Sequence, residues 1–357
     1  KVWRKTPSME LEEFKREIDP LILDFLDRKI KNLPSHANKN VDYYLNYLKK
    51  FLTEGKRIRP YLAYITYKAY GGKKDKEAIN LLIFLELFHA FALIHDDIMD
   101  KADKRHDIPT AHQYIKSYVS NIRDIDSLHF GVSEAILLGD YLYSWTNELL
   151  NSNKKFEEKI LRKVRDIFFR MNDEVFLGQM IDFDITLNEK ANEKDITDKT
   201  ILKTAYYSFV RPMHVGAALT GNSFDEKFFI NFGKALGLAF QTQDDLLDIK
   251  YDESQTHKSS FNDIAARQQT VFVYHVFHKG SKSQKDLLSR YFGKKLNNSE
   301  KLKLRKIFED SGAINYGEKI MKENFNQARK ILMKQKIDKK HKTQFLNLVE
   351  KIERRTS

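Results

Sequence analysis

The sequence contains the pattern Asp-Asp-x-x-Asp twice, and each copy follows a run of apolar residues. The first Asp cluster consists of Asp96, Asp97 and Asp100, and the second consists of Asp244, Asp245 and Asp248. Residues four apart share one face of an α-helix, so the first and last Asp of each cluster direct two carboxylates to one point. Mg²⁺ prefers oxygen ligands and combines one or two carboxylates with substrate phosphates. The clusters therefore predict two facing helix ends that bind a metal-coordinated diphosphate. The alternative is two solvated acidic helix ends.

Several basic segments have the side chains needed to bind phosphate. The segment Gly55–Pro60 packs Lys56, Arg57 and Arg59 ahead of an apolar helix, and a guanidinium can bind phosphate oxygens through two hydrogen bonds. Its alternative reading is a solvated helix start with a proline in the first turn. Polar loops after the two Asp clusters supply further cations, which are Lys104, Arg105 and His106 after the first and Lys258 and Arg267 after the second.

Isolated polar residues within apolar helical stretches are further candidates. His89 precedes Asp96 by seven residues, so both lie within about 20° on a helical wheel and we expect His89 to face the same site. An unpaired carboxylate at Asp182 would be costly to bury, which predicts a metal or phosphate partner. Lys203, Thr204 and Gln241 are similarly placed. Each of these residues also has an ordinary structural explanation, as a core histidine, a surface lysine or a buried amide.

Composition and periodicity predict an all-α protein. The chain of 357 residues has only 14 Gly and 6 Pro, so long uninterrupted helices are expected. We predict one large helical domain over residues 1–357, with a central cavity and both Asp-rich helix ends at its mouth. Apolar residues recur at helical spacing in twelve stretches: Leu11–Ile30, Val41–Leu52, Ile58–Tyr70, Ala78–Met99, Ser133–Leu150, Ile160–Ile185, Ile201–Leu219, Phe228–Ile249, Phe272–His278, Lys301–Phe308, Ala313–Met333 and Thr343–Ile352. The predicted loops are Lys101–Asp107, Asn121–Ser127, Asn188–Asp195, Lys250–Asn262 and Gly280–Gln284.

Composition also limits the function classes. The absence of Cys excludes disulfides, thiolate metal sites and cysteine nucleophiles. The formal net charge of +12 would permit nucleic-acid binding, but the lysines are spread along the chain and we expect no nucleic-acid partner. The longest apolar stretch, Leu81–Ile94, contains Glu86 and His89 and is too short for a membrane span. We therefore expect a soluble, cytoplasmic protein.

Together these residues resemble the trans-isoprenyl diphosphate synthases, the all-helical family that makes farnesyl and geranylgeranyl diphosphate. The resemblance extends from about Gly55 to Thr270, and the double Asp cluster among the other motifs makes it specific. The matching segments are GKRIRP from Gly55, HDDIMD from His95, PTAH from Pro109, AILLGD from Ala135, GQMIDFD from Gly178, KTA from Lys203 and FQTQDDLLD from Phe240.

The resemblance implies a role for each matched residue. Ligands of three Mg²⁺ ions on the allylic diphosphate would be Asp96, Asp100, Asp182 and Asp244, supported by Asp97, Asp245 and Asp248. The allylic diphosphate itself would be held by Arg105, Lys203 and Lys258, and isopentenyl diphosphate by Lys56, Arg59 and His89. Thr204 and Gln241 would lie near the reacting carbons. In this scheme an allylic cation forms, the isopentenyl double bond attacks it, and the released diphosphate takes the proton. The resemblance also implies a homodimer.

The sequence departs from the family pattern at two places. Where the family usually has a second Arg after Arg105, followed by Gly, this chain has His106 and Asp107. Where the family usually has Lys, five residues after Asp263, this chain has Gln268, and the adjacent Arg267 is the expected substitute. We therefore expect a difference in diphosphate binding or in substrate preference.

Product length in the family depends on bulk just before the first Asp cluster. Phe91 and Phe88 lie five and eight residues before Asp96, and Ala92 is small where eukaryotic farnesyl synthases usually have a second aromatic residue. This favours a C20 product, geranylgeranyl diphosphate, over C15 farnesyl diphosphate.

Three other functions would share part of this pattern. A non-catalytic partner subunit that binds prenyl diphosphates would fit the two departures, although both complete Asp clusters argue against it. A helical terpene cyclase would share only the first Asp cluster. A metal phosphohydrolase would leave the second cluster unexplained.

Overall fold

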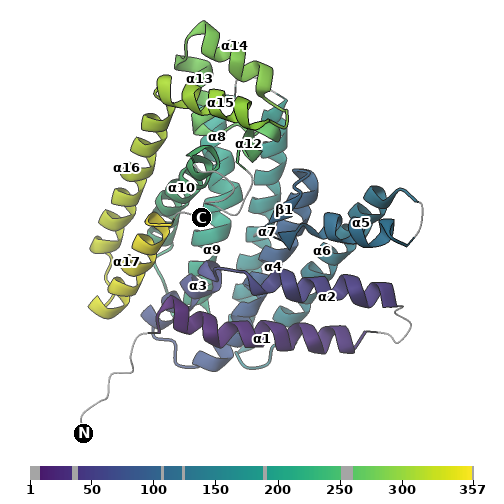
Figure 1. Ribbon diagram of the computed structural model, residues 1–357. Coiled ribbons are helices and arrows are strands. Elements are labelled where there is room, and N and C mark those ends of the chain that lie inside the picture. Colours follow the sequence, from purple (N-terminus) through teal and green to yellow (C-terminus); the bar gives the residue numbers. More distant parts are fainter. Residues whose placement is uncertain are drawn as a thin grey trace. The chain divides into compact units, whose positions relative to one another are not determined.

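The computed structural model describes residues 9–33, 39–105, 108–122, 125–187, 191–250 and 260–355 (Figure 1). Within these ranges nearly all regular structure is helical, and the only strands are a two-residue pair, so the prediction of an all-α fold is confirmed. The chain divides into two compact units. Unit 1 contains Lys1–Arg165, Gly216–Ser223 and Asp338–Gln344, and unit 2 contains Asp166–Val215, Phe224–Ile337 and Phe345–Ser357. The single domain over residues 1–357 stays a prediction.

Unit 1 is built around one apolar helix. Its elements are α1 (Leu11–Lys31), α2 (Lys39–Thr53), α3 (Ile58–Ala69), α4 (Asp75–Met99), β1 (Lys104–Arg105), β2 (Ile108–Pro109), α5 (Ala111–Ser120) and α6 (Ser127–Ser152). Helix α4 packs against α6 and α3, and most of its side chains are buried. Helix α4 has 25 residues, so it is longer than the predicted apolar run, and its most apolar stretch of 18 residues has a mean hydropathy of 1.8. By length and composition alone, α4 could therefore span a membrane. However, 72% of its most apolar stretch is buried, as expected of the central helix of a bundle.

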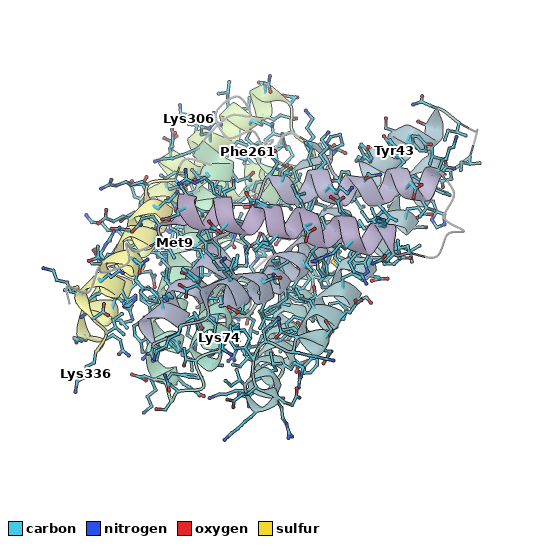
Figure 2. All side chains as sticks on the ribbon, turned by 90° about the horizontal axis from the view of Figure 1, so that it is seen from below. Met9, Tyr43, Lys74, Phe261, Lys306 and Lys336 are labelled. Carbon is cyan, nitrogen blue, oxygen red and sulfur yellow. The ribbon has the colours of Figure 1, made fainter. Side chains whose placement is uncertain are left out.

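An aromatic cluster joins α2 to α5 within unit 1. The ring of Tyr43, labelled in Figure 2, stacks on Tyr118 with centroids 4.0 Å apart and on Tyr114 at 4.8 Å. The Tyr47 hydroxyl donates a hydrogen bond to the backbone oxygen of Pro109 in β2 (2.8 Å). Helix α2 therefore supports the short β-hairpin that follows the first Asp cluster.

Unit 2 contains most of α7 (Glu158–Thr186) and a π-helical segment. The elements after α7 are α8 (Glu193–Thr200), the π-helix η1 (Ile201–Val210), α9 (Arg211–Ala218), α10 (Glu226–Lys250), α12 (Asn262–Ala265), α13 (Val271–Lys279), α14 (Lys282–Tyr291), α15 (Asn298–Asp310), α16 (Ala313–Lys334) and α17 (Lys339–Glu353). Helix α10 packs against both η1 and α16, which lies beside it in Figure 1. The unit boundaries at residues 165, 215 and 344 fall within α7, α9 and α17.

Two glycines allow α7 and α10 to approach η1 closely. A Cβ atom on Gly178 of α7 would lie 2.5 Å from the backbone nitrogen of Lys203, and one on Gly237 of α10 would lie 2.4 Å from the Cα of Ala205. Both distances are too short for a side chain, so only glycine fits. One turn after each glycine come Asp182 and Gln241. The close packing therefore brings the polar residues of three helices together.

The differences from the sequence-based expectation lie in short helices. Helix α8 replaces part of the predicted loop Asn188–Asp195, and its start is marked by Asn192, whose side chain accepts a hydrogen bond from the Asp195 amide (2.9 Å). The predicted helix Ile201–Leu219 consists of η1 followed by α9. Helix α14 begins inside the predicted loop Gly280–Gln284, where Ser281 and Gln284 form a capping box. Helices α8 and α14 were not predicted because most of their side chains are polar or charged, which leaves few apolar residues to show periodicity.

We predict that Gly237→Ala lowers the free energy of unfolding by about 1 to 3 kcal/mol, because the added methyl group collides with the backbone of η1. At an ordinary helix position the same substitution stabilises by up to about 1 kcal/mol, so the sign of the effect is informative. Urea denaturation measures the change. The exposed residue Asn231 on the same helix provides the control, and Asn231→Ala is expected to stay within about 0.5 kcal/mol of the original protein. Equal or greater stability of Gly237→Ala would contradict the close packing.

Candidate active site

The first Asp cluster lies at the C-terminal end of α4, where backbone hydrogen bonds terminate the helix. Lys101 adopts a left-handed conformation (φ 53°), and its amide donates to the Ile98 oxygen (3.2 Å) while the Ala102 amide donates to the Asp97 oxygen (2.9 Å). This pair of bonds is the Schellman motif, which usually has glycine at the left-handed position. The motif fixes the last turn of α4, and with it the positions of the three aspartates.

Arg105 of β1 turns back onto this cluster. Its Nε and Nη2 atoms donate to Oδ1 of Asp97 at 2.9 and 2.6 Å, and Nη2 lies 3.9 Å from an Asp96 oxygen. The Asp97 side chain is only 1% exposed, so this pair compensates a buried charge. The Asp96 side chain is more exposed, at 23%. Asp97 therefore forms an ion pair with Arg105 of the hairpin, whereas the Asp96 side chain lies nearer to solvent. The predicted role of Arg105 in binding diphosphate stays a prediction.

The basic segment Gly55–Pro60 is anchored by Arg57, the one of its three cations to which the family resemblance gives no role. Arg57 is buried, has φ 56°, and forms ion pairs with Asp19 (2.6 Å) and Glu86 of α4 (2.8 Å). The neighbouring Lys56 is exposed and Arg59 is half-buried. Arg57 therefore ties the segment to α1 and α4. Lys56 and Arg59 remain the predicted ligands of isopentenyl diphosphate.

Two phenylalanines of α4 precede the Asp cluster, and both are buried. Phe88 is fully buried and Phe91 nearly so, and the Phe91 ring lies 4.7 Å from the His95 ring and 5.0 Å from the Tyr143 ring of α6. His89 is half-buried on the same helix. The structure thus gives both phenylalanines a packing role. Their influence on product length, and the contact of His89 with substrate, stay predictions.

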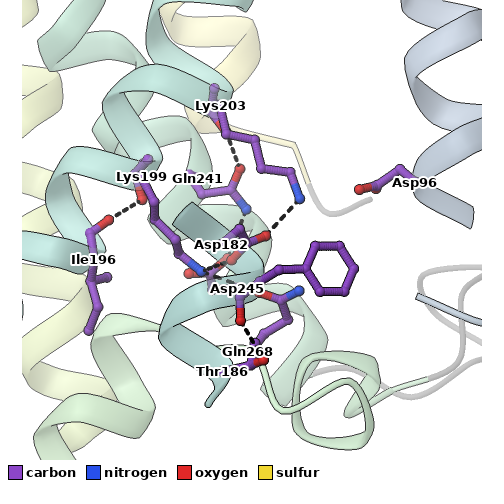
Figure 3. A network of polar contacts seen from close by, with 12 residues as sticks. Asp96, Asp182, Thr186, Ile196, Lys199, Lys203, Gln241, Asp245 and Gln268 are labelled. Carbon is purple, nitrogen blue, oxygen red and sulfur yellow. Dashed lines mark hydrogen bonds and ion pairs between the residues drawn. The ribbon is translucent and has the colours of Figure 1, made fainter. Parts of the chain in front are cut away.

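In unit 2, a buried carboxylate lies between two lysines (Figure 3). Asp182 of α7 is 3% exposed, and its two oxygens accept hydrogen bonds from Lys199 of α8 (2.6 Å) and Lys203 of η1 (2.8 Å). Burial alone would raise the pKa of the Asp182 carboxyl, but the two ammonium groups outweigh it and lower the pKa. Two lysines thus compensate the Asp182 carboxylate, where the sequence predicted a metal or phosphate partner; metal binding by Asp182 stays a prediction. Lys199 was missed, although its spacing of four residues from Lys203 was a signal.

A second chain of hydrogen bonds connects η1 to the second Asp cluster. The Thr204 hydroxyl donates to Oε1 of Gln241 (2.8 Å), and Nε2 of Gln241 donates to Oδ1 of Asp245 (2.9 Å). Burial raises the pKa of the Asp245 carboxyl to about 7, and the nearby carboxylates of Asp244 and Asp248 add to the increase. The structure therefore brings Thr204, Gln241 and Asp245 together, as three residues from two helices.

The other two aspartates of the second cluster have different partners. Asp244 pairs with Arg355, which follows α17 near the end of the chain (2.9 Å). The Arg355 guanidinium also lies 3.8 Å above the Phe240 ring. Asp248 accepts hydrogen bonds from the Asn262 and Asp263 amides (3.0 and 3.1 Å), so it caps the short helix α12. No local pattern predicts the contact between Arg355 and Asp244, because the two residues are far apart in the chain.

Two predicted diphosphate ligands follow the second cluster. Lys258 lies outside the described residues, and so does His106, the altered position after the first Asp cluster. The Arg267 guanidinium stacks over the Phe292 ring at 5.3 Å, and the residue has φ 58°.

The first Asp cluster belongs to unit 1 and the second to unit 2. That the two clusters face each other stays a prediction.

The donor chemistry of these residues suits Mg²⁺, because all seven predicted metal ligands are carboxylates. Among the described residues, no three acidic or histidine side chains converge closely enough to hold an ion by themselves. Such convergence is not required where substrate phosphates supply the remaining oxygens. The compensating cations of Asp182 and Asp244 would have to give way to the metal.

We predict that the stability of the metal-free protein falls as the pH rises from about 4 to about 7. In this range the unfolded chain has already released the Asp245 proton, since the ordinary pKa is 3.8, whereas the folded protein retains it until about pH 7. Raising the pH therefore favours unfolding, by an order of 2 to 4 kcal/mol in total. Chemical denaturation in the presence of a chelator, at a series of pH values, measures the slope.

Asp245→Asn is the matched control, because it cannot ionise and keeps an oxygen that accepts from Gln241. Its stability is expected to change less with pH in this range. The Asp182 carboxyl has a lowered pKa, so it is already ionised throughout this pH range. Identical slopes for the two proteins would contradict the raised pKa of Asp245.

Comparison with known proteins connects this arrangement to a family. Residues 41–310 match the family model for polyprenyl synthetase. A geranylgeranyl diphosphate synthase of Sulfolobus acidocaldarius is 30% identical over 254 residues, which cover 71% of this chain and 72% of the relative. A short chain isoprenyl diphosphate synthase of Methanocaldococcus jannaschii is 30% identical over 288 residues, covering 80% of each chain.

The solved structures agree with the sequence comparisons. The fold is similar to that of a geranylgeranyl pyrophosphate synthase from Corynebacterium glutamicum, complexed with isoprenyl diphosphate and magnesium. The TM-score is 0.91 at 26% identity, over 97% of this chain and 99% of the other. The resemblance inferred from the sequence motifs is thereby confirmed. This chain belongs to the polyprenyl synthetase family and is a prenyltransferase.

Proposed function

We propose that this enzyme condenses isopentenyl diphosphate with an allylic diphosphate, head to tail and in the trans configuration, to give geranylgeranyl diphosphate. The observation that carries the proposal is the presence of both complete Asp clusters in a chain of this family, together with a third buried carboxylate held between two lysines. Support for the C20 product comes from relatives named geranylgeranyl diphosphate synthase at about 30% identity. Farnesyl diphosphate is the alternative product.

We assign Mg²⁺ to the aspartates of the two clusters. Asp96 and Asp100 would hold metal on one side of the allylic diphosphate, and Asp244, with Asp182, on the other; three ions per site remain the expected number. When bound, the metal neutralises the diphosphate and makes it a better leaving group. Asp97 and Asp248 serve the site indirectly, since one pairs with Arg105 and the other caps α12.

The remaining polar residues would bind and orient the two substrates. Lys203 would bind the allylic diphosphate, and in support of this its ammonium group already binds a carboxylate oxygen at 2.8 Å. The linked side chains of Thr204 and Gln241 would stabilise the developing allylic cation through their oxygen atoms. Lys56, Arg59 and His89 would bind isopentenyl diphosphate. Arg105, Lys258 and Arg267 are further candidates for phosphate contacts.

The aromatic residues of α4 would limit chain growth. Phe91 and Phe88 pack against Tyr143 of α6, with ring centroids 5.0 and 6.3 Å apart, so their rings have little freedom to move. We infer that this packed group sets the product length. The small side chain at Ala92 would leave room for a product longer than C15.

The exposed surface of α7 favours a homodimer. Large apolar side chains recur at helical spacing on its exposed face, and these are Phe169, Phe176, Leu177, Met180 and Phe183. A contiguous exposed apolar face on a helix marks an interaction surface. We propose that this face contacts a second copy of the chain. We also retain cytoplasmic location as an expectation.

The function is tested by incubating the purified protein with Mg²⁺, isopentenyl diphosphate and an allylic starter (dimethylallyl, geranyl or farnesyl diphosphate). The expected product is C20 from each starter, as sized by chromatography after dephosphorylation. Asp96→Ala and Asp244→Ala are expected to lower turnover by at least about 100-fold, because each removes a metal ligand. Their unfolding midpoints are expected to change little, since both side chains are partly exposed.

Each other outcome has a definite meaning. Condensation that ends at C15 would favour the alternative product. Binding of the allylic diphosphate without any condensation would identify a non-catalytic partner subunit. Full activity of either Asp variant would contradict the metal assignment.

A further inference from the structure

The basic segment Gly55–Pro60 of unit 1 is held in place by a single guanidinium group. The Arg57 side chain is only 2% exposed, which is unusual for an arginine. Its Nε donates to Asp19 of α1 (2.6 Å), its Nη1 donates to Glu86 of α4 (2.8 Å), and its Nη2 donates to the backbone oxygen of Leu52. One side chain therefore joins the segment to α1, to the last turn of α2 and to α4.

The backbone of Arg57 has a conformation that long side chains rarely adopt. Its φ of 56° lies in the left-handed region, which glycine usually occupies. Such strain persists where the surrounding contacts impose it, and it clusters at functional sites. Arg57 also immediately precedes α3, and its backbone oxygen accepts a hydrogen bond from the Tyr61 amide (3.0 Å). The contacts of the guanidinium thus fix the point at which α3 begins.

Gly55 leaves the space that the guanidinium fills. A Cβ atom at this position would collide with Nη1 of Arg57 and would lie 3.1 Å from Oε2 of Glu86. These two atoms form the buried ion pair, so a side chain at residue 55 would push them apart. The exposed Lys56 therefore lies between two residues that are both fixed by the same contact.

The carboxylate that Arg57 binds on α4 lies one turn from another predicted ligand of isopentenyl diphosphate. Glu86 precedes His89 by three residues, so the two are neighbours on the helix surface. A buried ion pair often adds no stability over apolar residues of similar volume, but it can specify the relative positions of the elements that it joins. The elements joined here carry Lys56 and Arg59 on one side and His89 on the other.

We propose that Arg57 is a positioning residue for isopentenyl diphosphate. All three of its side-chain nitrogens bind protein acceptors, so it acts through its neighbours. It orients Lys56 and Arg59 so that they bind one diphosphate together with His89. This inference rests on the proposed function, because that function supplies the substrate and the roles of these three ligands.

The double variant Arg57→Met/Glu86→Leu tests the proposal by replacing the buried ion pair with apolar side chains. Such a replacement is often neutral for stability, and water can hydrate Asp19, whose side chain is 28% exposed. The KM for isopentenyl diphosphate is expected to rise by about 10-fold to 100-fold, because a displacement of about 1 Å can have an effect of this size. The KM for the allylic diphosphate is expected to stay within about twofold.

Arg57→Lys is a second variant that keeps a cation beside both carboxylates. A lysine lacks the planar fork of the guanidinium, so it cannot bind all three acceptors in the same geometry. We expect a folded protein whose KM for isopentenyl diphosphate is raised by at least about fivefold, again with little change in the KM for the allylic diphosphate. Titration calorimetry with isopentenyl diphosphate is expected to show the same losses of affinity in both variants.

Lys68 on α3 provides the matched control. It forms an ion pair with Asp75 of α4 (2.7 Å), so it joins the same two helices at the other end of α3. Lys68→Met is expected to keep both KM values within about twofold. Circular dichroism and unfolding midpoints establish that each variant is folded. If either folded Arg57 variant binds isopentenyl diphosphate like the control, Arg57 has only a structural role and the proposal is wrong. An equal rise in both KM values would also overturn it.

The condensation assay of the original protein separates this inference from the proposed function. Condensation by the original protein, combined with unchanged isopentenyl diphosphate binding in the Arg57 variants, overturns the inference and leaves the function intact. Absence of condensation overturns the function, and the calorimetric comparison would then still decide the role of Arg57. If the original protein does not bind isopentenyl diphosphate, both are wrong.

Discussion

Compensation of buried negative charge is the interaction on which the candidate site depends. A carboxylate at the end of an apolar helix is unstable unless a cation or a hydrogen-bond donor lies against it. Asp97 is paired with Arg105, Asp182 with Lys199 and Lys203, and Asp244 with Arg355. Asp248 is satisfied by two backbone amides, and Asp245 by an amide side chain and a raised pKa. Cations and hydrogen-bond donors of the protein thus compensate the carboxylates to which we assign metal binding.

The backbone makes these pairs possible. Glycines on α7 and α10 allow both helices to approach η1 closely, and the polar residues follow one turn later on each helix. The π-helical segment is unusual, since such segments are generally a single turn and often mark functional sites. Here it extends for ten residues and includes Lys203 and Thr204. In unit 1, the Schellman motif at Lys101 has the equivalent role of fixing the first Asp cluster.

Much of this could be predicted from local sequence, and the rest could not for identifiable reasons. Helical periodicity located α4 and α10 together with the Asp clusters at their ends, because both helices are long and strongly apolar. Lys199 was missed because α8 is short and polar, so its side chains looked like those of a solvated surface. The ion pairs of Arg57 and Arg355 were not predicted, because their partners are distant in the chain and pairing of this kind leaves no local pattern. The positions of the two Asp clusters relative to each other depend on tertiary structure in the same way.

The central claim is that both Asp clusters bind metal on a single diphosphate. The most direct measurement is a crystal structure with Mn²⁺ and a non-reactive allylic diphosphate analogue, in which anomalous scattering locates the ions. We predict Mn²⁺ bound by Asp96 and Asp100, and further Mn²⁺ bound by Asp244, all sharing oxygens of one diphosphate, with Arg355 displaced from Asp244. Metal at one cluster only, or clusters that bind separate ligands, would contradict the account.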